Sequence, residues 1–536
     1  MISDGISYLD LGDSYLRADW SNAANAYWSP MYPWLLGISM KLVKPSLWWQ
    51  FPLVHVVNFV VFLWALFCFR YFVRSLLADQ QFEQSRLTVL RVFHLPQWVL
   101  WAIAYALFLW SSLVLIGIWI VTPDLLLSSW IYLAAGLLVR LRSQNSYPKF
   151  LMLGVVLGAA YLSKGVMFPL AFALLTIALF SGNSVISRIP LVVSAAVAFL
   201  VIASPLIVLL SHAKGRLTYG DSGKLAYAWL VSPGFHQING QSGSLGVLVH
   251  PTRKILEHPP VYEFAQPIGG SFPPWYDPSY WNDGLRPRFN LRSQVRALVA
   301  NLSTYLRLLA AQSGWLAGVL TFALIGRSAT IRGIARNWPL IIFSMAALGL
   351  YAFVFAIPRY AAAFLLVLCL SVAAGIRLPE LNGRDQFVKC VAIATVATMM
   401  FSVTQPLLEM AYQGLLFGGT WGRQEPMRVA EGLQYLGLRT GDHVAIIGIG
   451  ITDFWSRLGG FKIVAQIMPQ DEGADEFWSS SRERKNIVYS SMAQSGALAV
   501  ITRSPPTAFL DPSWQQIPGT YYYLHFLRRQ SDVRTP

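Results

Sequence analysis

Long apolar runs dominate the pattern of hydrophobic and polar positions along this chain. Ten of them approach the roughly 20 residues that a helix needs to cross the hydrocarbon core of a bilayer. They lie at about 48–75, 97–118, 124–141, 149–164, 166–183, 188–211, 302–325, 338–356, 360–378 and 389–412. Strict helical periodicity is absent from these runs, as is typical of helices that are apolar on all sides. The pattern predicts a polytopic all-α membrane bundle over 48–412.

Three stretches are less apolar and are expected outside the membrane. Residues 1–47 form a first loop, in which aromatic residues and prolines between Tyr27 and Trp34 suggest an interfacial helix. Residues 212–300 form a long loop within the bundle. Residues 420–536 are predicted to form a small α/β domain with helices near 426–437 and 482–494 and strands at His443–Ile447, Ala497–Thr502 and Tyr521–Phe526.

The short loops differ in their Lys and Arg content, and this difference predicts the orientation. Loops after the first, third, fifth, seventh and ninth runs carry most of the basic residues, so they are assigned to the cytoplasm. With ten spans, both chain ends and the three less apolar stretches then lie outside. Met1 would start on the outer side with no preceding span to carry it there. We therefore expect that the sequence as given lacks a first helix.

Composition supports a membrane protein and excludes several other classes. Apolar residues make up 55% of the 536 residues and charged residues only 12%, against about 45–50% and about 25% in globular domains. These values exclude a disordered chain, a coiled coil and a small disulfide scaffold. The net charge of +15 could indicate a nucleic-acid partner, but the placement of the basic residues is explained by membrane orientation. The three cysteines show no metal-ligand spacing.

Ionisable residues at membrane depth are costly and are therefore functional candidates. In the predicted topology Asp4, Asp10, Asp124, Lys164 and Arg359 all gather at the outer rim of the bundle. A carboxylate there can act as a general base on an acceptor hydroxyl or amine. The cations can hold and neutralise a phosphate leaving group. This combination suits cleavage of a sugar–phosphate bond.

Four motifs in this order resemble those of C-type (GT-C) glycosyltransferases, the group that includes the protein O-mannosyltransferases and the aminoarabinose transferases. They are Asp4–Tyr8 with Asp10 and Trp28–Pro33, Thr122–Asp124, Leu162–Gly165, and Pro358–Tyr360. The resemblance covers about 1–380. It implies a GT-C-like bundle with a C-terminal extracytoplasmic α/β domain, in the cytoplasmic (inner) membrane of a bacterial cell envelope. It also implies a polyprenyl-phosphate-linked sugar donor and a lipid, glycan or protein acceptor.

The resemblance also implies roles for individual residues. Asp4 is expected to be the catalytic base, and Asp124 a second acidic residue of the catalytic site, which orients the acceptor or the base. Lys164 and Arg359 are expected to bind the carrier phosphate, and Tyr8, Asp10 and Tyr360 are further substrate-binding candidates. Gly5 stands where relatives usually have Glu, and Asp10 is a candidate to compensate for it. Relatives differ in their metal requirement. No dedicated carboxylate cage is evident here, so we expect no metal and no other cofactor.

Each of these residues also has an ordinary structural interpretation. Asp4 could be a turn residue, because Asp-Gly is a common turn pair. Asp124 could simply complement the dipole of a helix N-terminus, with no catalytic role. Lys164 and Arg359 could be membrane-edge anchors. The resemblance, together with a single base for direct displacement, implies an inverting hexosyl- or pentosyltransferase that uses a polyprenyl-phosphate sugar. A transporter or lipid flippase and a polysaccharide ligase or polymerase remain the alternatives.

Overall fold

The computed structural model describes residues 1–89, 92–182, 184–233, 254–264, 266–281, 287–380, 384–416, 420–469, 473–506 and 512–527. The chain divides into two compact units, which are described separately. Unit 1 comprises 1–57, 234–288 and 414–536, and unit 2 comprises 58–233 and 289–413. The long loop 212–300 is thus shared between the units, its middle part grouping with the two chain ends.

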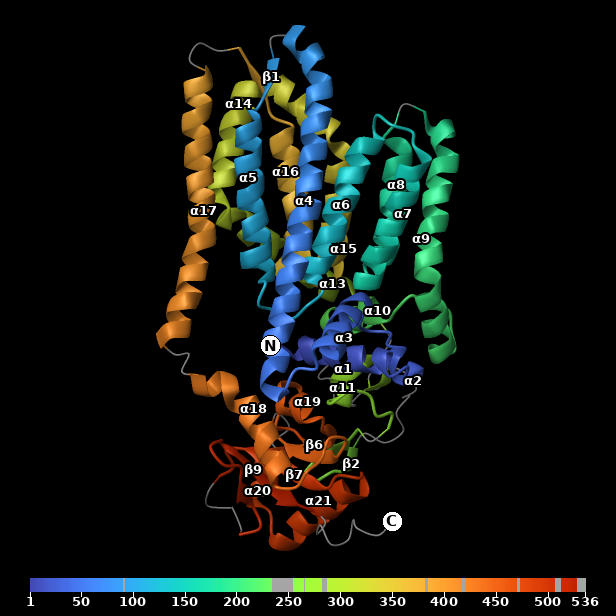
Figure 1. Cartoon of the computed structure of the whole chain (residues 1–536), viewed down its shortest axis with the longest axis vertical. Helices are drawn as coiled ribbons and strands as arrows, with labels where there is room; N and C mark the ends of the chain where they lie inside the picture. The colour runs from blue at the N-terminus through green and yellow to red at the C-terminus, as the bar shows by residue number, and fades with distance from the viewer. Residues whose placement is uncertain are drawn as a thin grey trace. The chain divides into compact units, whose positions relative to one another are not determined.

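Unit 2 is a helical bundle (Figure 1). Its helices are most of α4 (Gln50–Val89), α5 (Gln97–Leu109) with the π-helical continuation Trp110–Ile116, α6 (Asp124–Leu141), α7 (Tyr147–Ser163), α8 (Met167–Phe180), α9 (Val185–Lys214), α10 (Ser222–Leu230), α13 (Leu291–Ala311), α14 (Ser313–Arg336), α15 (Trp338–Val354), α16 (Pro358–Ala374) and α17 (Arg384–Leu416). In the described part of the chain, six helices are long and apolar enough to cross a membrane, and four shorter apolar helices accompany them. The predicted fold class is confirmed.

The predicted span at 302–325 is wrong, because the chain breaks at Gln312 between α13 and α14. One face of α13 is polar and buried: Gln294, Asn301 and Tyr305 donate hydrogen bonds to the backbone carbonyls of Phe353, Ala352 and Leu348 in α15. The other face is apolar and exposed. Arginines in the first turns of α13 lower the mean hydropathy of that part of the helix. The apolar run in the sequence therefore begins within α13 and continues into α14.

Charged side chains tie together the helix ends at one end of unit 2. Asp79 of α4 pairs with Arg142 and Arg336, and Glu83 pairs with Arg336 and Arg377. Strands β1 (Val92–His94) and β4 (Arg377–Pro379) pair antiparallel in the same region. This group of three arginines and two acids is called the arginine anchor below. Its members come from helices far apart in the sequence, so it fixes how those helix ends pack.

Arg188 makes a second tie between helix ends in unit 2. Its side chain is 1% exposed. The guanidinium donates to the carbonyl oxygens of Leu141 and Ala178 and to the Asn145 side chain. These carbonyls belong to the last turns of α6 and α8, where intrahelical partners are lacking. Arg188 therefore caps two helices at once, and its charge suits their C-terminal dipoles.

Unit 1 combines the N-terminal helices with a mixed sheet. The helices are α1 (Ser3–Leu16), α2 (Trp20–Ala23), α3 (Met31–Val43), α11 (Pro273–Tyr276), α12 (Pro278–Trp281), α18 (Thr420–Tyr435), α19 (Trp455–Gly459), α20 (Gly473–Ser479) and α21 (Arg482–Gln494). The strands are β2 (Lys254–Leu256), β3 (Val261–Glu263), β5 (His443–Ile447), β6 (Lys462–Ile467), β7 (Ala499–Arg503), β8 (Gln515–Gln516) and β9 (Tyr522–Phe526), in the order β2-β3-β6-β5-β7-β9-β8. The α/β domain expected at 420–536 is present, and two strands from the long loop extend its sheet.

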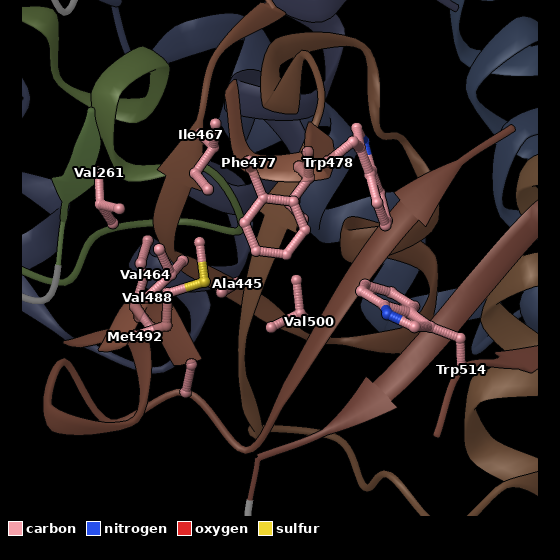
Figure 2. Close-up of a cluster of buried hydrophobic side chains, with 13 residues drawn as sticks. Val261, Ala445, Val464, Ile467, Phe477, Trp478, Val488, Met492, Val500 and Trp514 are labelled. Atoms are coloured by element: carbon pink, nitrogen blue, oxygen red, sulfur yellow. The ribbon is translucent and has the colours of Figure 1, made fainter. Parts of the chain in front are cut away.

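An apolar core fills one side of this sheet (Figure 2). Phe477 and Trp478 of α20 pack with Met492 of α21 and with Trp514 near the C-terminal strands. Ala445 and Ile447 of β5, Val464, Ala465 and Ile467 of β6 and Val500 of β7 supply the facing side chains.

The aromatic stretch in the first loop has a mixed role. In α3, Ile38 and Leu42 are exposed, consistent with the expected interfacial helix. Trp28 and Tyr32 are instead buried against Tyr8 of α1, with ring centroids 5.0 and 5.4 Å from it. Part of the aromatic stretch therefore forms the core of unit 1.

Candidate functional site

Asp124 lies at the centre of a charged cluster in unit 2. It is the first residue of α6, following Pro123, and its side chain is 2% exposed. A carboxylate at a helix N-terminus is stabilised by the unpaired N–H groups and the helix dipole. The helix end accounts for the position of Asp124 but leaves its carboxylate free to face other elements of the bundle.

Lys164 reaches Asp124 from the junction of α7 and α8. The backbone at Lys164 is extended, with φ −159° and ψ 126°, so α7 stops and α8 begins three residues later. The Lys164 Nζ lies 2.5 Å from Asp124 Oδ1. The Leu162–Gly165 motif thus lies where the chain leaves α7 and before it enters α8. The extended backbone there directs the Lys164 ammonium group toward the start of α6.

Arg359 and Tyr360 complete the cluster from the first turn of α16. The Arg359 Nε lies 3.6 Å from Asp124 Oδ2. The Tyr360 ring lies beneath the lysine, with Lys164 Nζ 3.4 Å from its centroid. Pro358 is the first residue of α16. The absence of its N–H costs no hydrogen bond at this position, because the first N–H of a helix has no intrahelical partner. Three of the four sequence motifs therefore meet in one place.

The three charged side chains of this cluster are largely buried. Asp124, Lys164 and Arg359 are 2%, 20% and 18% exposed, and the Asp124 carboxylate contacts both cations. Burial raises the strength of charge–charge interactions relative to water. Lysine and arginine side chains can also donate charge-assisted hydrogen bonds to a phosphate group.

Tyr351 belongs to the same cluster and was not predicted from the sequence. Its ring stacks on Tyr360 with centroids 5.3 Å apart and an interplanar angle of 30°. Its hydroxyl is buried and has no hydrogen-bond partner among the described residues. A tyrosine in an apolar helix reads as a core residue, so only the structure reveals a donor beside the charged cluster.

Asp4 and Tyr8 lie in unit 1, on helix α1. Asp4 is in the first turn and is partly exposed, so the interpretation of Asp-Gly as a turn pair is wrong. Tyr8 is 5% exposed and packs edge-on against Trp28 and Tyr32. The role of Asp4 as a base and that of Tyr8 in substrate binding stay predictions.

Asp10 is held by other parts of unit 1. Its Oδ2 accepts hydrogen bonds from the Ser271 N–H at 2.6 Å and the Ser271 hydroxyl at 2.7 Å, and its Oδ1 lies 3.1 Å from Arg457 Nε. Burial raises the pKa of Asp10, while Arg457 and the Ser271 hydrogen bonds lower it to a smaller degree. These contacts fasten α1 to the loop before α11 and to α19. They give Asp10 a structural role beside the predicted one.

A small cleft adjoins these contacts within unit 1. It is lined by Ser3, Ser7, Asp10, Trp275 and Asp453, among others. Asp453 accepts a hydrogen bond from the Tyr522 hydroxyl at 3.0 Å, and burial raises the pKa of its carboxyl to about 6. Among the described residues, no group of three or more His, Cys, Asp or Glu side chains could hold a metal ion.

Comparison with known proteins returns solved structures only. No family model matches the chain, and no curated protein sequence matches it. ArnT from Cupriavidus metallidurans in the apo state has 13% identity and a TM-score of 0.41, over 99% of this chain and 94% of that chain. The same protein bound to undecaprenyl phosphate has 12% identity and a TM-score of 0.40, over 99% and 94%.

A second group of structures comes from an archaeon. The oligosaccharyltransferase AglB from Archaeoglobus fulgidus, in complex with an inhibitory peptide and a dolichol-phosphate, has 12% identity and a TM-score of 0.45, over 93% of this chain and 65% of that chain. Both ArnT and AglB are GT-C glycosyltransferases, the family that the four motifs resemble. With identities and TM-scores this low, the likeness assigns no role to any residue of this chain.

Proposed function

We propose that this protein is a membrane glycosyltransferase that moves a sugar from a polyprenyl-phosphate carrier to an acceptor on the outer face of the cytoplasmic membrane. The observation that carries the proposal is the convergence of Asp124, Lys164 and Arg359, three motif residues that are 40 and more positions apart, on one buried cluster. Two cationic side chains that share one buried cluster suit a phosphate ligand.

The proposed reaction is a single displacement at the anomeric carbon. Asp4 removes a proton from an acceptor hydroxyl or amine, and the acceptor atom forms a bond to that carbon. The bond from the anomeric carbon to the phosphate oxygen breaks, and its electron pair stays on the phosphate. Lys164 and Arg359 stabilise the negative charge that develops there. Attack from the side opposite the leaving group inverts the configuration.

Asp124 has two duties in this proposal. In the absence of a carrier it holds both cations, which keeps them at the site without burying unpaired charge. When a phosphate binds, Lys164 and Arg359 turn toward it, and the Asp124 carboxylate becomes available to the acceptor or to Asp4. The exchange of one anion for another leaves each cation paired throughout.

The experiment that tests the function uses the purified chain in lipid nanodiscs with labelled polyprenyl-phosphate sugar. Release of free polyprenyl phosphate that depends on an acceptor supports the transferase. Passage of label across liposomes without cleavage would instead support a transporter or flippase. Growth of a glycan chain on a saccharide acceptor would support a ligase or polymerase.

Matched variants sharpen this test. Lys164→Ala is expected to abolish release, whereas Lys149→Ala, which removes a lysine at the other end of the same helix α7, is expected to leave it unchanged. Equal activity of the two variants would contradict the assignment of the phosphate site.

A further inference from the structure

A loop of unit 2 lies beside the Lys164 junction and is held rigidly. Helix α9 ends at Gly215 in a left-handed conformation, φ 62°. The loop then folds back: Ser211 and Thr218 exchange hydrogen bonds, and the Tyr161 hydroxyl donates to the Tyr219 carbonyl at 2.9 Å. No motif was identified in this loop from the sequence alone. The loop delivers Asp221 to the start of α10.

Asp221 is buried in an unusual way. Its side chain is 3% exposed, and its Oδ1 pairs with Arg216 Nη2. Its Oδ2 is buried and has no hydrogen-bond partner in the part of the chain that the structure describes. An aspartate at the N-cap position of a helix normally accepts a hydrogen bond from a backbone N–H of the first turn. Asp221 occupies this position in α10, but its side chain makes no capping hydrogen bond.

A buried carboxylate oxygen without a donor is costly, and such atoms in native proteins are usually satisfied. The fold leaves this oxygen unsatisfied while a capping interaction was within reach of the same residue. This pattern indicates that the donor comes from a bound ligand.

The residues around Asp221 indicate what kind of ligand would bind there. Ser222 Oγ lies 3.7 Å from the position that a Cβ on Gly165 would take, so Asp221 and Ser222 adjoin the turn that carries Lys164. Next to Asp221 is Tyr219, which is 44% exposed and stacks on Phe168 with centroids 4.5 Å apart and an angle of 13°. An aromatic ring and a carboxylate oxygen without a donor thus belong to the same short loop, which adjoins this turn.

The chemistry favours a neutral donor of several hydroxyl groups. Asp221 already has a cationic partner in Arg216, so a second cation is not needed for charge balance. A metal ion is not favoured either, since the described residues provide no group of three ligands. A sugar ring presents hydroxyls to a carboxylate and an apolar face to an aromatic ring.

We propose that Asp221 and Tyr219 form the subsite for the sugar of the carrier lipid, with Asp221 Oδ2 accepting a hydrogen bond from a sugar hydroxyl. The inference rests on the proposed function, because it places the sugar next to the phosphate held by Lys164. Asp221 is then a specificity-determining residue, and it recognises the part of the donor that the phosphate site does not touch.

The test compares two lipids on the full chain in nanodiscs. The probes are undecaprenyl phosphate and undecaprenyl phosphoryl glucose, and the measurement is the dissociation constant of each. The wild type is expected to bind the glucosylated lipid more tightly. Asp221→Asn is expected to weaken binding of the glucosylated lipid about tenfold, the size of one hydrogen bond to a charged group, and to leave binding of undecaprenyl phosphate unchanged.

Control variants separate recognition from loop structure. Arg216→Gln removes the partner of the other Asp221 oxygen and is expected to keep the preference for the glucosylated lipid. If Arg216→Gln loses it as Asp221→Asn does, the carboxylate serves only the loop and the subsite is refuted. An equal effect of Asp221→Asn on both lipids, or none on either, would also refute it. Failure of the wild type to bind either lipid would overturn the proposed function itself.

Discussion

Neutralising Asp124 is expected to tighten carrier binding while it reduces turnover. In the structure the Asp124 carboxylate occupies both cations, at 2.5 Å from Lys164 and 3.6 Å from Arg359. A phosphate that uses the same cations competes with this carboxylate and is repelled by it. Asp124→Asn removes the competitor and keeps the shape of the side chain.

The size of the effect follows from the geometry. Two unit charges about 5 Å apart interact by about 3 kcal/mol at an effective dielectric constant of about 20. Part of this gain is offset, because Lys164 and Arg359 lose one of the contacts that order them, and their ordering on phosphate binding then costs about 1–2 kcal/mol of side-chain entropy. A net gain of about 1–2 kcal/mol corresponds to roughly 5- to 30-fold tighter binding of undecaprenyl phosphate.

The assay is a titration of undecaprenyl phosphate into the full chain in nanodiscs, with transfer measured in parallel. Lys164→Met provides the opposite sign, since it removes a cation and is expected to weaken binding. Thermal unfolding without lipid should show Asp124→Asn to be less stable than the wild type, because two largely buried cations lose an anionic partner. Unchanged or weaker lipid binding by a folded Asp124→Asn protein would refute the competition between carboxylate and phosphate.

The remaining predictions concern the base, a buried acid and a helix cap. Asp4→Asn should abolish transfer and leave undecaprenyl phosphate binding unchanged, with Asp442→Asn as a loop control; retained turnover would exclude Asp4 as the base. Burial raises the pKa of Asp453 to about 6, against an ordinary value near 4. Between these two pH values the folded protein keeps a proton that the unfolded chain loses. The free energy of unfolding therefore falls as the pH rises from about 4 to about 6 and stays low above that. Asp453→Asn should raise the unfolding midpoint at pH 7 and flatten this pH dependence; an unchanged profile in thermal melts from pH 4 to 7 would contradict it. Arg188→Met should lower the free energy of unfolding by about 3 kcal/mol because buried carbonyls of α6 and α8 lose their donor, and a melting temperature equal to that of the wild type would count against the double cap.

Much of the fold follows from hydropathy, since a membrane helix is specified by a continuous apolar run. The break at Gln312 was missed because the buried polar face of α13 donates to carbonyls of α15, and the bonded residues are 43 to 59 positions apart in the sequence. Strand β6 was missed as well. It is specified by its neighbours β5 and β3, and β3 comes from a distant segment of the chain.

The charged cluster could be predicted in part for a related reason. Asp124, Lys164 and Arg359 interrupt apolar sequence, and such interruptions are rare enough to be conspicuous. Tyr351 and Asp221 carry no comparable signal, because a tyrosine in an apolar helix and an aspartate in a long loop are both ordinary. What distinguishes them is an unsatisfied buried oxygen, a property of three-dimensional contacts alone.

Helices α6 and α16 explain why one charged cluster suits a ligand and the other does not. Each helix has a site residue at its start, Asp124 or Arg359, and an anchor residue at or just beyond its end, Arg142 or Arg377. In the arginine anchor, the guanidiniums also donate to backbone carbonyls, those of Arg336, Ala374 and Ile376.

Carbonyls that belong to the chain cannot leave when a ligand arrives, so the anchor holds a fixed arrangement of helix ends. In the site cluster the shared partner is a single side chain, which can be displaced by another anion. The helices α6 and α16 connect the two clusters and are stiff. The arginine anchor at one end of these helices therefore helps to position the site cluster at the other end, without taking part in the hydrogen bonds of that cluster. Acidic and basic side chains therefore act as structure in the arginine anchor, where backbone carbonyls are also partners, and suit the proposed phosphate site in the cluster around Asp124, where the shared partner is exchangeable.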